Sequence, residues 1–168
     1  KNRMKVLLDS SGEFAWLLGD DDEIFDDSIG YLYELLKSDI KTGFAFINYY
    51  LGKEGEKTAI MSSDDCEITT DLVSFTAKTM FANSLVSSCL FRRSLLVESK
   101  MSRYVGLEFS HLYWAANIAK DNDALIIKKP LFNFHHPGVH ESRRFDYAPG
   151  QPAQDFDIHF RAHVNFLK

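Results

Sequence analysis

Apolar and polar residues alternate in blocks along this chain, and the blocks have the lengths of short strands and helices. Short apolar runs bounded by turn residues predict buried strands, and apolar residues at i, i+3, i+4 and i+7 predict helices with one buried face. On this basis strands are expected at residues 14–18, 44–51, 58–61, 85–91, 124–128 and 131–135. Helices are expected at residues 2–10, 28–37, 70–80, 107–120 and 155–168, with a further short helix from Arg93.

This order of elements predicts an α/β fold with a mixed sheet flanked by helices. Residues 14–18 are apolar throughout, which is typical of a strand covered on both faces, so we expect them at the centre of a single sheet. The helix over residues 28–37 should bury one face, formed by Ile29, Leu32, Tyr33 and Leu36. A polar loop with Pro and Gly follows at residues 136–152.

Composition limits the class of protein. The 168 residues, 45% of them hydrophobic, are enough for about one globular domain. The net charge is −5, yet six acids lie within residues 20–27, and the rest of the chain carries +1. No basic tract predicts nucleic-acid binding, and no apolar run is long enough to span a membrane. No signal peptide is expected, and the widely spaced Cys66 and Cys89 suggest reduced thiols in the cytoplasm.

The most informative motif joins an apolar run to four acids, Trp16-Leu17-Leu18-Gly19-Asp20-Asp21-Asp22-Glu23. Ligands of open α/β sheets bind beyond the carboxyl ends of the strands. Adjacent carboxylates repel one another unless a cation lies among them, and hard oxygen ligands suit Mg²⁺ or Mn²⁺. The pattern therefore predicts a divalent metal site. A solvated acidic loop that caps the next helix is the alternative from the residues alone.

Three segments resemble family-2 glycosyltransferases with the GT-A fold, most nearly the abequosyltransferase-like branch. Residues 11–22, Ser-Gly-Glu-Phe-Ala-Trp-Leu-Leu-Gly-Asp-Asp-Asp, resemble that family's G-E-Y-hydrophobic-DXDD stretch. Residues 87–94 are similar to its strand followed by F-R-R, and Gly106-Leu107-Glu108-Phe109 resembles its G-x-E-D segment. The likeness covers about residues 2–135. The family's amino-terminal P-T-Y-N strand has no counterpart here, so the chain resembles a fragment without the nucleotide-binding half.

The resemblance implies the carboxyl-terminal portion of a GT-A fold. Residues 1–140 would form the metal and acceptor side of the catalytic domain, and residues 141–168 a loop and an amphipathic helix. The implied reaction transfers a sugar from a nucleotide-diphosphate donor to a saccharide or lipid-linked saccharide acceptor, with inversion, in bacterial surface polysaccharide synthesis. The enzyme would be cytoplasmic, with at most peripheral contact with the inner face of the membrane.

The same resemblance implies roles for particular residues. Asp21 and Asp22 would contact Mn²⁺ or Mg²⁺, and Asp20 the donor ribose or a metal-bound water. Glu108 would be the general base, on the first turn of the 107–120 helix and on the order of 10 Å from the acidic motif across a cleft. His111, three residues on, would orient Glu108 or replace it. Positive groups that close over the donor diphosphate would come from His140, Arg143 and Arg144.

Several alternatives remain open. Phe109 stands where the family's usual catalytic Asp is found, which favours a catalytically silent interaction domain with the same fold. Glu108 would in that case form a structural ion pair with Arg92, Arg93 or Arg103. An aspartyl-phosphate phosphatase also places D-x-D after a buried strand, but the Gly-Thr that normally follows is missing. A zinc stripe at Asp155, His159 and His163, and loop ligands at His135, His136 and His140, are further alternatives.

Overall fold

The computed structural model describes residues 2–20, 22–37, 41–51, 58–61, 66–79 and 82–134. Asp21, the predicted loop at residues 136–152, the predicted terminal helix and every candidate ligand at or beyond His135 lie outside the described residues.

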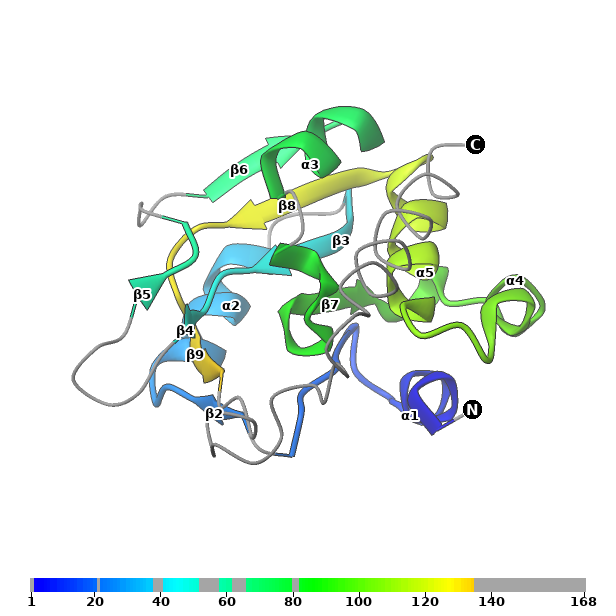
Figure 1. The fold of residues 1–168 in the computed structure, drawn as a ribbon, viewed down its shortest axis with the longest axis horizontal. Coiled ribbons are helices and arrows are strands. Elements are labelled where there is room, and N and C mark those ends of the chain that lie inside the picture. Colours follow the sequence, from blue (N-terminus) through cyan, green and yellow to red (C-terminus); the bar gives the residue numbers. More distant parts are fainter. Residues whose placement is uncertain are drawn as a thin grey trace, which may run out of the picture.

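Short helices are interspersed with groups of short strands along the described chain (Figure 1). The α-helices are α1 (Asn2–Asp9), α2 (Ser28–Leu36), α3 (Leu72–Thr79), α4 (Glu98–Met101) and α5 (Ser110–Ala119). The strands are β1 (Phe14–Trp16), β2 (Glu23–Ile24), β3 (Thr42–Ile47), β4 (Tyr50–Leu51), β5 (Thr58–Ala59), β6 (Cys66–Thr69), β7 (Cys89–Arg92), β8 (Asp123–Ile127) and β9 (Phe132–Phe134). Single 3₁₀ turns are η1 (Ala82–Ser84), η2 (Val86–Ser88), η3 (Arg93–Leu95) and η4 (Ser102–Tyr104).

The strands form two mixed sheets. The larger has the order β1-β7-β3-β8-β6, with β3 and β8 parallel and the other neighbours antiparallel. The smaller has the order β2-β9-β4-β5, with β9 and β4 parallel. A mixed sheet is thus confirmed, although the described chain has two sheets where the sequence suggested one.

Helices lie on both faces of the larger sheet. Phe44 and Phe91 are paired across β3 and β7 and share one face, where Phe44 contacts Phe75 of α3 edge-to-face at 5.4 Å. Leu90 points to the opposite face because successive strand residues alternate. There, α2 borders a groove of about 560 Å³ that Leu90 also lines. The helical flanks expected from the sequence are therefore present.

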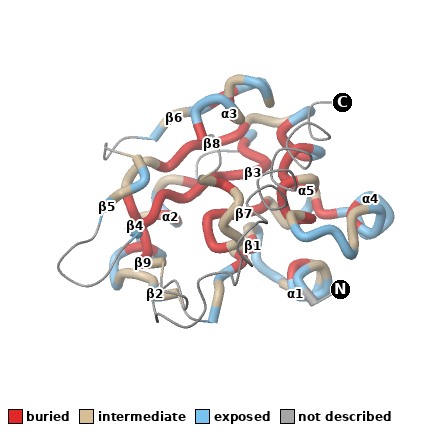
Figure 2. Tube along the Cα trace, viewed as in Figure 1, coloured by how far each residue is buried: buried red, intermediate tan, exposed pale blue. Residues whose placement is uncertain are grey.

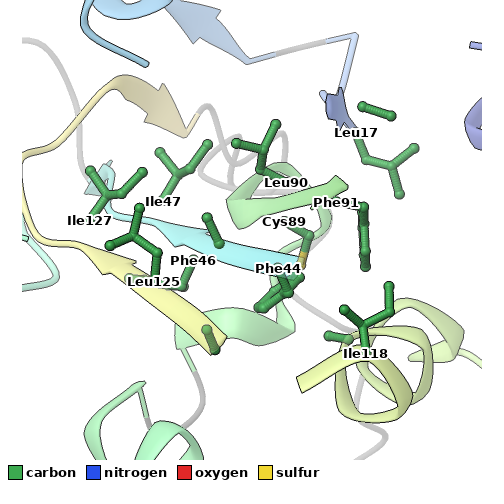
Figure 3. Close-up of a cluster of buried hydrophobic side chains, with 14 of the residues drawn as sticks. Leu17, Phe44, Phe46, Ile47, Cys89, Leu90, Phe91, Ile118, Leu125 and Ile127 are labelled. Atoms are coloured by element: carbon green, nitrogen blue, oxygen red, sulfur yellow. The ribbon is translucent and has the colours of Figure 1, made fainter. Parts of the chain in front are cut away.

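The core is centred on β3, β7 and β8. Residues 44–47 of β3 and 124–127 of β8 are almost entirely buried, as the continuous apolar runs predict (Figure 2). Leu17, Phe91 and Ile118 bring the residue after β1, the middle of β7 and α5 into the same cluster (Figure 3).

The predicted central position of residues 14–18 is wrong. Within the described chain, β1 is an edge strand that pairs with β7 alone. Ala15 and Leu17 are buried, whereas Phe14 and Trp16 are half-buried and Leu18 is 38% exposed. An uninterrupted apolar run cannot distinguish a central strand from an edge strand, because the run contains no information about how many strands pair with it.

Other boundaries also differ from the predictions. In α2, Leu32 and Leu36 are buried as expected, but Ile29 is 58% and Tyr33 67% exposed, because the helix presents only a narrow stripe to the sheet. The predicted strand 44–51 divides into β3 and β4 around Asn48, whose amide donates to the carbonyls of Met61 and Lys128. Strand β6 was not predicted at all.

Candidate functional site

The acidic motif lies in a turn between the larger and the smaller sheet. The chain leaves β1 at Trp16 and reaches β2 at Glu23, and the amide of Asp22 donates to the carbonyl of Gly19 at 3.3 Å. Asp20 is exposed, and Asp22 is partly buried. Of the two predicted metal ligands, the described chain thus shows Asp22, while Asp21 lies outside it.

Ser87 anchors this turn. Its hydroxyl donates to Oδ2 of Asp22 and accepts a hydrogen bond of 2.8 Å from the amide of Gly19. Its carbonyl accepts a 2.7 Å bond from the indole Nε1 of Trp16. Ser87 is itself only 1% exposed. One buried residue therefore holds both ends of the acidic turn and the strand residue that precedes it.

Ser87 belongs to residues 82–88, two successive 3₁₀ turns that we call the 82–88 turn. The sequence predicted the second half of this segment as the start of a strand, but β7 begins only at Cys89. Buried hydroxyls explain the difference, since Ser88 donates to the carbonyl of Leu85 at 2.7 Å and so favours a tight turn. The 82–88 turn contacts Asp22, Tyr49 and His111.

Tyr49 reaches the 82–88 turn from the segment between β3 and β4. Its hydroxyl donates to the carbonyl of Ala82 at 3.3 Å, and its ring stacks on Phe132 at 5.3 Å. Burial raises the pKa of Tyr49 to about 12, with smaller contributions from Cys89 and from the charge of Asp22. The phenol is therefore protonated at neutral pH.

His111 contacts the same turn from α5. Its ring Nε2 lies 2.9 Å from the carbonyl of Ser84, so this nitrogen carries the proton, and Nδ1 is buried without a hydrogen-bond partner. Burial lowers the pKa of His111 to about 4; the hydrogen bond to the carbonyl of Ser84 partly opposes this shift, and the charge of Arg3 contributes to it. The imidazole is therefore neutral at pH 7, and its side chain, 1% exposed, is directed to the turn and not to solvent.

Glu108 lies just before α5, not within its first turn as predicted, because the helix begins at Ser110. It is exposed and borders an open cavity of about 440 Å³. Arg3 of α1 lines the same cavity and donates to the backbone carbonyl of Glu108 at 3.2 Å. The rest of the lining comes from Met4, Val105, Gly106, Leu107, Ser110 and Trp114.

The alternative ion pairs of Glu108 are not formed within the described residues. Arg92 pairs with Glu13 at 2.6 Å, and Arg93 donates to the carbonyls of Leu8 and Ser10. Nor does His111 orient Glu108, since the hydrogen bond of its ring goes to Ser84.

The structure thus brings together some of the predicted site residues. Asp22 and His111 are both attached to the 82–88 turn, one through Ser87 and the other through Ser84. The cavity beside Glu108 has no described residue of the acidic motif in its lining. A cleft shared by Glu108 and Asp22 therefore remains a prediction.

The potential metal ligands around the acidic turn suit a site in which water and substrate complete the coordination better than one in which the protein supplies every ligand. No group of three or more potential ligands among His, Cys, Asp and Glu occurs in the described part of the chain. Mg²⁺ is commonly held by one or two carboxylates together with water and substrate phosphates. A partly buried Asp22, oriented by a hydroxyl donor, suits that kind of site.

Sequence reasoning missed Ser87, Tyr49 and Arg3. Ser87 and Ser88 stand as a polar pair inside an otherwise apolar stretch, and buried hydroxyls need partners, so that pair was the available signal. No local pattern indicates the contacts of Tyr49 and Arg3, because their partners lie 33 and 105 residues away.

Neither the protein-family models nor the curated proteins compared with this chain gave a match. In the described residues, no helix has the length and apolar character needed to cross a membrane.

Proposed function

We propose that this chain is part of a glycosyltransferase that moves a sugar from a nucleotide-diphosphate donor to a saccharide or lipid-linked saccharide acceptor. The observation that carries the proposal is the attachment of Asp22 to the 82–88 turn, since the side chain of a residue in the DXD-like motif is fixed by a buried donor. Support from the sequence comes from the three segments that resemble family-2 enzymes. The setting we propose is the bacterial cytoplasm, in surface polysaccharide synthesis.

In the proposed reaction, the acceptor hydroxyl oxygen forms a bond to the anomeric carbon of the donor sugar. The bond from that carbon to the diphosphate oxygen breaks, and its electron pair leaves with the diphosphate. A bound Mn²⁺ or Mg²⁺ supplies positive charge for the departing group. Asp22, with Asp21, would hold the cation, and Asp20 would bind the donor ribose or a water on the metal. Arg143, Arg144 and His140 would supply further donors to the diphosphate.

Glu108 is the proposed acceptor of the hydroxyl proton. Its exposure on an open cavity gives a hydroxyl access to the carboxylate, and no described residue neutralises it in an ion pair. His111 is the weaker candidate for the general base. Its side chain is almost completely buried, and its proton-bearing Nε2 donates to the carbonyl of Ser84.

Metal binding is the first test. Titration of Mn²⁺, with and without a panel of nucleoside diphosphates, should give a dissociation constant at least tenfold weaker for Asp22→Asn than for wild type. Glu34→Gln is the matched control, because it removes one negative charge from the exposed surface of α2, outside the acidic motif. Equal affinity in wild type and Asp22→Asn rejects the metal site.

Sugar transfer is the second test. Radiolabelled nucleotide-diphosphate sugars are incubated with the chain, Mn²⁺ and a panel of saccharide and lipid-linked acceptors. Glu108→Gln should lose transfer while keeping Mn²⁺ affinity, and Glu98→Gln on α4, another exposed acid, should keep both. Transfer that survives in Glu108→Gln rejects this residue as the base.

The silent interaction domain is the second candidate, and one observation favours it. Phe109 occupies the position of the expected catalytic Asp, and its ring lies 6.1 Å from that of His111. Sugar transfer that is present in wild type and lost in Glu108→Gln would exclude this alternative.

A further inference from the structure

We infer that Ser87 is a positioning residue that holds the acidic turn in its metal-binding conformation. The inference rests on the proposed function, because it assigns Ser87 a role toward the cation expected at Asp22. It concerns a residue 65 positions away in the sequence that no pattern around the acidic motif indicates.

The hydroxyl of Ser87 uses both of its capacities within one turn. A serine hydroxyl has one proton to donate and lone pairs to accept. Here the proton goes to Oδ2 of Asp22, and a lone pair receives the amide proton of Gly19. The two bonds fix the first and last residues of the turn 19–22 relative to one another. The carboxylate is thereby oriented before any ligand arrives.

The hydroxyl is held rigidly in place. Ser87 is 1% exposed, and its carbonyl accepts the indole proton of Trp16. Next to it, the amide of Leu17 donates to the carbonyl of Cys89 at 3.3 Å, where β1 and β7 meet. Water therefore has little access to this position and cannot easily replace the hydroxyl as the hydrogen-bond partner of Asp22 and Gly19. Partners of this kind orient metal-binding carboxylates, and removing them typically weakens metal affinity by about 10–100-fold.

Ser88 provides a matched control. It is fully buried in the same turn, and its hydroxyl donates to the carbonyl of Leu85 and not to the acidic turn. Ser87→Ala and Ser88→Ala each remove one buried hydroxyl from the 82–88 turn. A general loss of stability should affect both variants, whereas loss of positioning should affect only Ser87→Ala.

The test uses Mn²⁺ as the probe and the electron paramagnetic resonance signal of free Mn²⁺ as the readout. Ser87→Ala should bind Mn²⁺ at least about tenfold more weakly than wild type, Ser88→Ala should bind like wild type, and Ser87→Thr, which keeps the hydroxyl, should recover most of the affinity. Unchanged Mn²⁺ affinity in Ser87→Ala overturns the inference while leaving the proposed metal site intact. A wild type that binds no Mn²⁺ overturns the proposed function itself.

Hydrogen exchange of the Gly19 amide, followed by nuclear magnetic resonance without metal, is the second measurement. Exchange should accelerate at least about tenfold in Ser87→Ala, which loses the acceptor, and stay as in wild type in Ser88→Ala. An unchanged exchange rate of the Gly19 amide in Ser87→Ala overturns the positioning role of Ser87, whatever the Mn²⁺ affinity of this variant.

Discussion

Replacing Gly43 with Ala tests how closely β3 and α5 are packed. A Cβ added at this position would lie 2.6 Å from Cγ2 of Ile118 and 2.8 Å from both Cβ of Asn122 and Cδ1 of Leu95. All three distances are shorter than real Cβ contacts, and the three atoms belong to different residues. One of them, Cβ of Asn122, can move only with its backbone. No single change of rotamer can therefore make room for the methyl group.

The expected cost follows from these contacts. Overpacking a well-filled core costs roughly 1–3 kcal/mol. Removing a glycine also reduces the conformational entropy of the unfolded chain, and this raises the free energy of unfolding by about 0.4–1 kcal/mol. Taking the middle of each range, about 2 kcal/mol against about 0.7 kcal/mol, the net loss of unfolding free energy in Gly43→Ala should be about 1–2 kcal/mol. For a chain of this size, that corresponds to a fall in the melting temperature of roughly 2–8 °C.

Gly30→Ala is the control, because a Cβ at that exposed position of α2 would have no atom within 4 Å. Alanine favours a helix interior by about 1 kcal/mol over glycine, so this variant should be more stable than wild type. Both variants are compared by urea unfolding monitored by circular dichroism. A Gly43→Ala protein as stable as wild type would refute the argument that β3 approaches α5 too closely for a side chain.

Two further predictions concern titratable groups. Burial lowers the pKa of His111 from its usual 6.5 to about 4, so the unfolded chain binds more protons than the folded chain between these pH values. The free energy of unfolding should therefore rise with pH from about 4 to 6.5, by up to about 3 kcal/mol. Urea unfolding across this range should show a shallower dependence in His111→Gln, and an equally steep one would contradict the shift. For the cysteines, a disulfide-forming thiol reagent should modify exposed Cys66 quickly and buried Cys89, whose pKa burial raises to about 12, only as the chain unfolds. Two thiols that react at the same fast rate would contradict this assignment.

The apolar pattern was sufficient for most of the elements. It located α1, α3, β8 and β9 to within a few residues, since their periodicity and their flanking turn residues are local properties. It also located the acidic turn after an apolar strand. Cys66 and Cys89 are free thiols, in agreement with the expectation from their spacing.

The tertiary structure decided which of these elements are neighbours. The edge position of β1 depends on its pairing with β7, about 75 residues further along, and the division of the predicted strand 44–51 depends on the bonds of Asn48 to distant carbonyls. The link from Ser87 to Asp22 spans 65 residues in the same way. The sequence by itself determined the local elements and the acidic motif, because short-range sterics and periodicity specify them. Only the folded chain determined the surroundings of that motif, because hydrogen bonds between distant segments form when the core packs.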